Sequence, residues 1–537
     1  MATHSTATRF PAPPSVRPLP QVIQGGMGVA VSSWRMAAAV ARAGQLGVVS
    51  GTALDTVLAR RLQDGDPGGE LRRALAAFPV QAVADRVIDR FFRPGGRAGA
   101  PYRPVPRLAI GQSTAGQELA ILGNFVEVWL AKEGHDGSVG VNFMEKVQMA
   151  TPAAAYGAML AGVDYVLVGA GIPREFPHLL DRLAAHLPVR LPITVVGADE
   201  GSHGVELEPR ALLGEDLPAL TRPTFLAIVS AHVLAAYLAR DEQIRPDGFV
   251  IEGPRAGGHN APPRGRLTLD ETGQPIFGPR DDADTDKVAA LGLPFWLAGS
   301  YGTPDQLVAA RAIGAVGVQV GSLFALCEES GLTESLRADL MARLRTGTLE
   351  VRTDAGASPT GFPFKVAQLP GTLSDLDVRA ARERLCDLSY LRTPYLRGDG
   401  AVGYRCPAEP VHTYLRKGGT LEDTEGRACL CNALTANVGL GQTRRDGYSE
   451  EALVTLGADV ESVRRLADAH PGGWSATDVL HWLLPAGPAP ATTRVGVVKA
   501  STERSREQLL ARRFTAGEID VDADHRALEV PENRNSQ

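Results

Sequence analysis

Residues 248–264 read GFVIEGPRAGGHNAPPR, and the rest of the chain is organised around this stretch. Residues 249–251 are apolar, and the run is too short for a helix, so it predicts a buried strand. The chain then breaks at Gly253-Pro254 and Gly257-Gly258 before His259. Glycines let a backbone approach a flat ligand closely, and an imidazole exchanges protons near neutral pH. Taken alone, the same residues also fit an ordinary turn.

Strands and helices alternate on both sides of this stretch. Apolar runs predict strands at 22–24, 46–50, 139–142, 165–168, 225–229, 249–251, 295–298 and 317–320. Helices are predicted between them at 33–43 (with Ser33 as N-cap), 152–161, 176–185, 231–239 and 304–313. This alternation is typical of a parallel α/β sheet, and eight units favour a closed (β/α)8 TIM barrel over an open doubly wound sheet.

Glycines at many strand ends support the barrel. They are Gly25, Gly26, Gly169, Gly253, Gly299 and Gly321. In a barrel these ends converge on one face, where the active site lies, whereas an open sheet strings them along an edge. No GxGxxG motif with a downstream acid follows an early strand, which also disfavours the open sheet.

Two segments depart from the alternation. Residues 51 to about 137 are mostly helical, with amphipathic spacing at 71–77, 80–92 and 117–133, and predict a long helical insertion after the second strand. A hairpin is expected at 193–196 and 204–207. The predicted domains are a disordered N-terminal segment (1–18), the barrel (19–347), a mainly helical, partly irregular extension (348–517) and a disordered tail (518–537).

The last two strands end in the most specific pattern of the chain. Residues 297–304, LAGSYGTP, lead into a helix with Pro304 near its start, and residues 318–324, VQVGSLF, follow one unit later. Free backbone N–H groups at such turns bind anions, and barrels commonly hold a phosphate after strands seven and eight. Either motif alone also fits a tight turn, but the tandem favours a phosphate site.

Composition and charge exclude several classes of partner. The chain has 537 residues, 44% of them hydrophobic, and its formal net charge of −6 gives no general attraction to nucleic acid or anionic membranes. Its first residues lack the apolar core of a signal peptide, and no apolar run reaches spanning length. We therefore expect a soluble cytoplasmic protein that binds neither nucleic acid nor membrane.

The C-terminal extension has weaker periodicity. Residues 359–365, PTGFPFK, predict a turn-rich segment that folds back over the barrel mouth, and 376–386 and 458–469 predict helices. Cys406, His412, Cys429 and Cys431 raise the possibility of a zinc or iron–sulfur site. Their spacing contains no CxxC pair, so we predict reduced structural thiols and no metal. Cys327 is expected in the core.

With AGGH at 256–259, GSYG at 299–302 and QVGS at 319–322 in place, the chain resembles the nitronate monooxygenase (2-nitropropane dioxygenase) family over about 19–332. The resemblance implies an FMN-binding barrel with the flavin across the carboxyl ends of the strands and with His259 as the catalytic base. The FMN-binding positions that it implies are Gly25, Gly26, Met27, Asn142, Glu252, Gly257, Gly258, Gly299, Ser300, Gln319, Val320, Gly321 and Ser322.

Two positions depart from the family pattern. The family commonly has glutamine where this chain has Glu252, and an acid where this chain has Arg255. A carboxylate near a flavin disfavours the anionic reduced ring unless it is protonated or paired. Arg255 is therefore expected either to pair with Glu252 or to attract an anionic substrate.

The leading hypothesis is an FMN-dependent oxidoreductase that oxidises alkyl nitronates with O2, although other small anionic or acyl compounds also fit. His259 would remove an α-proton from a neutral nitroalkane or hydrogen-bond the nitro oxygens. One alternative is an FMN-dependent enoyl-thioester reductase that uses NAD(P)H, and another is a non-catalytic barrel for a phosphorylated ligand. IMP dehydrogenase-like chemistry is disfavoured, because no cysteine lies in the sixth-strand region.

Overall fold

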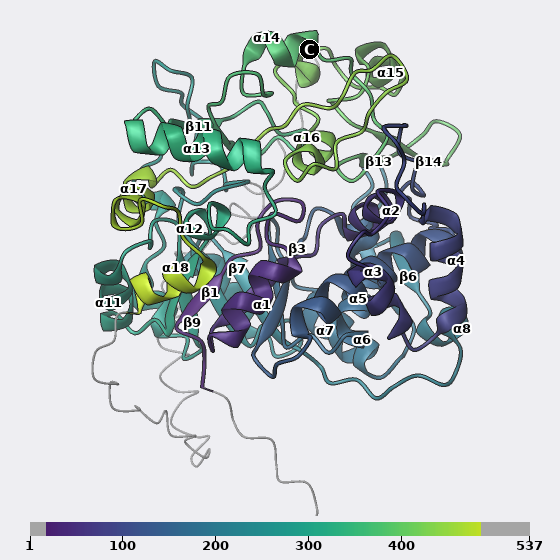
Figure 1. The fold of residues 1–537 in the computed structure, drawn as a ribbon, viewed down its shortest axis with the longest axis horizontal. Helices are drawn as coiled ribbons and strands as arrows, with labels where there is room; N and C mark the ends of the chain where they lie inside the picture. Colours follow the sequence, from purple (N-terminus) through teal and green to yellow (C-terminus); the bar gives the residue numbers. More distant parts are fainter. Residues whose placement is uncertain (1–17, 485–537) are drawn as a thin grey trace, which may run out of the picture.

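Eight parallel strands close into a barrel in the computed structural model, which describes residues 18–484 (Figure 1). The order of neighbours around the barrel is β1-β10-β9-β8-β7-β4-β3-β2. The strands are β1 Val22–Gln24, β2 Leu46–Ser50, β3 Val139–Met144, β4 Tyr165–Gly169, β7 Thr224–Val229, β8 Gly248–Glu252, β9 Phe295–Ala298 and β10 Gly317–Val320. The predicted TIM barrel is confirmed. The predicted terminal segment and tail lie outside the described residues.

The strands alternate between an inner and an outer apolar layer, because successive side chains of a strand point to opposite faces. Inside the barrel, Val250 of β8 packs with Trp296 of β9 and with apolar residues of four other strands. The Trp296 indole N–H donates to the Pro20 carbonyl at 2.8 Å, which satisfies its polar atom in the core. Outside, Phe249 and Ile251 belong to the large cluster beneath the helices.

Helices surround the barrel between the strands. They are α1 Trp34–Arg42, α6 Thr151–Leu160, α7 Phe176–Ala184, α9 His232–Arg240, α10 Thr285–Ala289, α11 Pro304–Ala312 and the short α12 Ser322–Ala325, with α8 Pro209–Leu213 and the 3-10 turns η1 Gln148–Ala150 and η2 Pro279–Asp281 in the loops. Helix α11 begins in a capping box in which Thr303 and Gln306 exchange hydrogen bonds. Thr303 and Pro304, the last residues of the GSYGTP segment, therefore serve to start helix α11.

Helix α1 starts where predicted, but Ser33 does not cap it. The Ser33 hydroxyl donates to the Glu329 carbonyl at 3.3 Å instead. The free N–H of Trp34 donates to Glu127 Oε1 at 2.8 Å. A carboxylate from the insertion thus takes the place of the local cap, a long-range contact that the local sequence does not reveal.

The helical insertion is confirmed. A hairpin also forms, but its first strand lies at 189–193 rather than at the predicted 193–196, and Val196 instead forms a β-bridge with Tyr395. The insertion comprises α2 Leu54–Gln63, α3 Glu70–Ala76, α4 Gln81–Phe91 and α5 Thr114–Lys132, drawn in dark blue in Figure 1, and the hairpin pairs β5 Val189–Ile193 with β6 His203–Leu207. Helix α5 is buried along most of its length between α2 and α6. None of the helices in residues 18–484 is both long enough and apolar enough to span a membrane.

The extension crosses the carboxyl ends of the barrel strands and combines short helices with two antiparallel strand pairs (Figure 1). It follows helix α13 Glu334–Thr346, and its elements are β11 Val351–Asp354, β12 Phe364–Ala367, α14 Leu376–Ala381, β13 Thr393–Leu396, β14 Val402–Arg405, α15 Val411–Arg416, η3 Glu422–Thr424, α16 Leu430–Ala436, α17 Val460–Ala469 and α18 Ala476–Leu483. The strand pairs β11–β12 and β13–β14 were not predicted, because their sequences VRTD, FKVA, TPYL and VGYR mix polar and apolar residues and lack the apolar runs of the barrel strands.

Helix α18 completes the outer layer of the barrel. It packs between α1 and α11, the place that a helix directly after β10 would fill. The helix after β10, α12, has only four residues. Trp474, just before α18, donates its indole N–H to the Leu323 carbonyl at 2.8 Å, and Trp482 donates to the Gly302 carbonyl at 3.0 Å. The extension is therefore part of the barrel's core rather than an appendage.

Candidate active site

Three polar side chains converge at the carboxyl end of the barrel. Asn142, Glu252 and Gln319 lie on β3, β8 and β10, each alternating with outward-facing apolar neighbours. The period of two therefore turns all three toward the barrel axis, above its apolar interior. Strand alternation thus brings together residues that are 67 or more positions apart in sequence.

The glycines after β1 are required by this ring of side chains. A Cβ on Gly26 would lie 2.4 Å from the Asn142 Cβ, and one on Gly25 would lie 3.3 Å from the Gln319 side chain. Asn142 also donates to the Gly26 carbonyl at 3.2 Å. Met27 follows, and its sulfur lies 3.4 Å from the place a Cβ on Gly321 would occupy. The fold thus brings these predicted positions together. Contact with neighbouring protein side chains is enough to explain why glycine is needed at Gly25 and Gly26.

The predicted phosphate end is only partly free. Gly299 and Ser300 both adopt positive φ, 85° and 77°, which is unusual for serine. The Val320 side chain packs outward in the core, and its carbonyl accepts from Gly25 N–H at 2.9 Å. The Ser322 hydroxyl accepts from the Gly457 N–H of the extension at 2.9 Å. The Val320 carbonyl and the Ser322 hydroxyl thus already accept hydrogen bonds from protein N–H groups.

Unsatisfied polar atoms mark the same region. Among residues 18–484, eight buried side-chain nitrogen or oxygen atoms have no hydrogen-bond partner. Three of them, Asn142 Oδ1, Ser300 Oγ and Gln319 Oε1, lie at the carboxyl ends of β3, β9 and β10. An unpaired buried polar atom costs about 1–3 kcal/mol, so such a group of atoms is typical of a ligand site. Their chemistry fits the polar groups of FMN.

His259 is held by the extension. Its Nε2 lies 2.7 Å from Ser358 Oγ, which lies 2.8 Å from Thr360 Oγ1. Its ring packs edge-on against Phe364 of β12 with the centroids 4.8 Å apart. Burial and the nearby Lys146 ammonium lower the pKa of His259 to about 3. The imidazole is therefore neutral at physiological pH. The prediction that residues 359–365 fold back over the mouth is confirmed.

The loop before His259 is fixed to the extension as well. The Gly258 N–H donates to Thr455 Oγ1 at 2.7 Å, and the Gly258 carbonyl accepts from Lys365 N–H at 2.9 Å. A Cβ on Gly257 would lie 2.9 Å from the carbonyl carbon of Leu456. The glycines of the AGGH motif thus permit close packing of the backbone against the extension, and not only an approach to a ligand.

Lys365, not Arg255, is the cation that acts on Glu252. Burial raises the pKa of Glu252 to about 7, and Lys365 partly opposes this increase. Lys365 is almost fully buried and donates to the Pro254 carbonyl, Asn260 Oδ1 and Thr353 Oγ1 at 2.7–2.9 Å. Arg255 is exposed, so the expected Arg255–Glu252 pair is wrong. Lys365 lies 113 residues away in sequence, which local spacing does not reveal.

Lys146 is a site residue that the sequence reasoning missed. It follows β3 in a loop and is half-buried, with Nζ 2.6 Å from the centroid of the Phe362 ring. Burial lowers the pKa of Lys146 to about 7, although Glu145 favours the charged form. It makes no hydrogen bond or salt bridge to another described residue. The segment 143–146, FMEK, follows Asn142 directly. A cation so close in sequence to a predicted ligand contact could have identified Lys146 as a site residue.

Residues 215–359 match the sequence model described as nitronate monooxygenase. The match covers 145 of the 537 residues and is a likeness of this segment. It contains Glu252, His259, Ser300, Gln319 and the His259 partner Ser358, whereas the glycines after β1 and Asn142 lie outside it. The protein is an oxidoreductase on a TIM barrel. No curated protein matches the chain.

Several solved structures align with this chain at low identity and low TM-score. FabK from Thermotoga maritima is 15% identical, with 87% of this chain and 91% of that chain covered and a TM-score of 0.43. Nitroalkane oxidase from Streptomyces ansochromogenes is 16% identical, with 86% and 94% covered and a TM-score of 0.40. The enoyl reductase domain of MlnA from Bacillus amyloliquefaciens is 11% identical, with 87% and 95% covered and a TM-score of 0.41. At these values the neighbours do not decide between substrates.

Proposed function

We propose that this chain is an FMN-dependent oxidoreductase that oxidises a small oxyanion, with O2 as the electron acceptor. An alkyl nitronate is the best candidate for the substrate. The observation that carries the proposal is the group of three unsatisfied buried atoms, Asn142 Oδ1, Ser300 Oγ and Gln319 Oε1, at the barrel mouth. The match of residues 215–359 to nitronate monooxygenase supports the same activity.

FMN would be held by residues of several strand ends. Asn142 and Gln319 supply polar groups from the inner face of the barrel, and Ser300 supplies a hydroxyl beside Gly299 and Gly321 for the phosphate end. When bound, FMN supplies the electron transfer between substrate and oxygen. The remaining steps depend on how the protein's own residues bind and orient the substrate.

Lys146 supplies the positive charge that an anionic substrate needs. Its ammonium lies beside His259 and has no hydrogen-bonding or ion-pair partner among the described residues. A charge-assisted hydrogen bond to a nitronate oxygen would favour the protonated amine and stabilise the bound anion. The Phe362 ring beneath the ammonium fixes its position by a cation–π contact.

His259 acts as a neutral hydrogen-bonding group in this proposal. A base whose conjugate acid has a pKa of about 3 removes an α-proton from carbon poorly, since general bases work best when their pKa lies near the operating pH. Of its two roles considered from sequence, hydrogen bonding to the nitro oxygens therefore has the stronger support. A preformed nitronate needs no base, which favours the nitronate over the neutral nitroalkane as substrate.

Reduction of an enoyl thioester by NAD(P)H is the second candidate. Glu252 favours it, because a carboxyl group with a pKa of about 7 is partly protonated at neutral pH. Such a group can deliver the proton that accompanies a hydride in enoyl reduction.

The test is the identity and the reduction of the flavin. Purified protein is heat-denatured, and the released cofactor is identified by chromatography, with FMN expected in non-covalent form. The native protein is then mixed anaerobically with a nitronate or with NAD(P)H, and flavin absorbance is followed. Bleaching by the nitronate supports the first function, and bleaching by NAD(P)H alone supports the second. FAD, or no flavin after reconstitution with FMN, contradicts both.

A further inference from the structure

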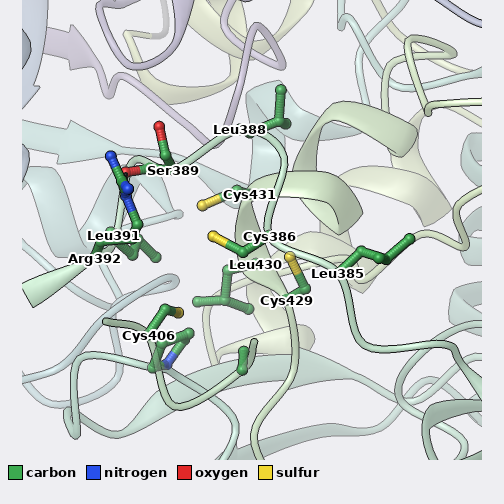
Figure 2. Close-up of a pocket in the computed structure, with 12 residues that line it drawn as sticks. Leu385, Cys386, Leu388, Ser389, Leu391, Arg392, Cys406, Cys429, Leu430 and Cys431 are labelled. Carbon is green, nitrogen blue, oxygen red and sulfur yellow. Dashed lines mark hydrogen bonds between the residues drawn. The ribbon is translucent and has the colours of Figure 1, made fainter. Parts of the chain in front are cut away.

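The extension gathers four of the chain's five cysteines around one small cavity. Cys386, Cys406, Cys429 and Cys431 line it, as Figure 2 shows, whereas Cys327 lies apart in the barrel core. They come from three separate segments, after α14, after β14 and at the start of α16. The cavity has a volume of about 10 Å³, which is room for about one water molecule and for no organic cofactor.

Two of these thiols are paired. The Cys386 and Cys406 side chains share a hydrogen bond, and Cys386 is half-buried whereas Cys406 is almost fully buried. No three of the His, Cys, Asp and Glu side chains in residues 18–484 are placed to bind one metal ion. The described cysteines thus form a cluster of four thiols around one cavity, in which Cys386 and Cys406 influence each other's ionisation.

The two thiols of the pair differ in acidity. The hydrogen bond from Cys406 is the main cause that lowers the pKa of Cys386 to about 7, and the Arg392 guanidinium adds to it against burial, Glu409 and Asp387. The hydrogen bond to Cys386 and burial raise the pKa of Cys406. A partly exposed thiolate beside a neutral thiol is the arrangement of an attacking and a resolving cysteine.

We propose that Cys386 and Cys406 are a redox-active thiol pair that reacts with small-molecule disulfides and closes into an intramolecular disulfide. The Cys386 thiolate attacks one sulfur of the small disulfide, and the other sulfur leaves as a thiolate. Cys406 gives its proton to solvent, attacks the Cys386 sulfur and expels the second thiolate. Two cysteine thiols thereby lose two electrons and two protons, and one small disulfide becomes two thiols.

The pair lies next to the candidate active site. Pro359 lines the same cavity and follows Ser358, the hydrogen-bond partner of His259. Ala428, which precedes Cys429, donates its N–H to the Ala357 carbonyl at 2.8 Å. The cysteine cavity and the His259 support therefore share one short segment of chain.

The test maps disulfides in the full-length protein. Reduced protein is incubated with glutathione disulfide, free thiols are blocked in acid, and peptides are analysed by mass spectrometry without reduction. A Cys386–Cys406 link that dithiothreitol reverses is expected, and Cys327→Ser and Cys431→Ser proteins should keep it. Two free thiols, a mixed disulfide that stays on Cys386, or a Cys429–Cys431 link would overturn the proposal. So would stoichiometric zinc or iron in the purified protein.

A second measurement reports on the pair without requiring oxidation. The rate of Cys386 alkylation by iodoacetamide is measured against pH, and half of the maximal rate is expected near pH 7. In a Cys406→Ala protein the midpoint should move toward the ordinary thiol value, because the hydrogen bond is lost. A midpoint that is ordinary in the wild type, or unchanged by Cys406→Ala, contradicts the pairing.

Discussion

His259 lies beside a cation, Lys146, and is held by a serine hydroxyl rather than a carboxylate. Catalytic histidines that serve as bases are usually oriented by a carboxylate that stabilises the imidazolium. Here the surroundings stabilise the neutral ring instead. At the residue scale, the site therefore favours binding and orientation of an anion over removal of a proton from carbon.

Replacement of His259 by asparagine tests this role. Asparagine keeps a polar group that can donate a hydrogen bond, so turnover of a preformed nitronate should fall by less than about tenfold. A general base would contribute about 10²–10⁴-fold. The measurement is kcat/KM for a nitronate and its parent nitroalkane, with flavin content as the control for folding. A selective loss of 10²-fold or more on the nitroalkane would restore His259 as a base.

Lys146→Met should weaken binding of the anionic substrate. Methionine keeps a similar length and the Phe362 contact but removes the charge, and a charge-assisted hydrogen bond is worth about 1.5–3 kcal/mol. The Kd or KM for a nitronate should therefore rise by roughly 10- to 100-fold, and Lys146→Arg should lose less. Because the ammonium lowers the pKa of His259, that pKa should also increase in the methionine protein. Unchanged nitronate binding would contradict the assignment.

Glu252 should make stability depend on pH. Its pKa in the folded protein is about 7, above the ordinary 4.5, so the folded state holds a proton that the unfolded state releases. Its contribution to the free energy of unfolding is therefore complete below about pH 4.5 and is lost as pH rises through 7. Denaturant unfolding of wild type and Glu252→Gln should diverge over that range, with the variant becoming relatively more stable. Parallel curves would show that Glu252 does not carry the shift.

At the scale of elements, the pair β11–β12 positions the active-site loop. His259 forms a β-bridge with Phe364, and the Asn260 N–H donates to the Pro363 carbonyl at 2.9 Å. Lys365 then reaches across and binds the loop carbonyl of Pro254. The loop after β8 is thus paired on one side like a strand, which keeps the imidazole in one orientation.

Lys365→Met should loosen this pairing. The change leaves three acceptors without their donor, and each buried unpaired group costs about 1–3 kcal/mol. We expect a lower midpoint in thermal unfolding and faster hydrogen exchange in residues 254–260. Arg352→Met on neighbouring β11 is the matched control, since Arg352 is exposed and pairs only with Glu350 nearby. Equal effects of the two changes would argue against a positioning role for Lys365.

At the scale of the whole molecule, the chain closes its barrel with its own distant end. Trp474, Val479, Leu480 and Leu483 are buried in the same core cluster as α1 and the barrel strands. Burial of such side chains contributes about 1.5–3 kcal/mol each. We therefore expect the barrel and the extension to fold as one cooperative unit.

A chain that ends at Gly347 should not form an independent barrel. Without α18 it exposes the apolar surfaces of α1 and α11, and without β12 it loses the partner of the His259 loop. Size-exclusion chromatography should show aggregation, and binding of FMN should be lost. Addition of residues 348–484 as a separate chain is the control that should restore some solubility. A monomeric, cooperatively unfolding truncated barrel would contradict this expectation.

The sequence by itself predicted the barrel, because eight apolar runs alternate with helical segments and glycines follow many of them, a pattern that favours a closed parallel arrangement over an open sheet. It also placed Asn142, Glu252 and Gln319 at strand ends, and strand alternation alone turns them inward. Residues 359–365 were correctly placed over the mouth, since turn formers after the last barrel helix predict a returning chain.

Only the tertiary structure decided which side chains interact with the residues of the site. The influence of Lys365 on Glu252, the His259–Ser358 hydrogen bond and the cation at Lys146 all join segments that are not adjacent in sequence. The same holds for the cysteine cluster around Cys386 and Cys406 and for the place of α18. Local propensity fixes where an element begins and which way its side chains point. Which charge lies beside which depends on how separate segments pack, and burial then sets the pKa values of the groups that are brought together.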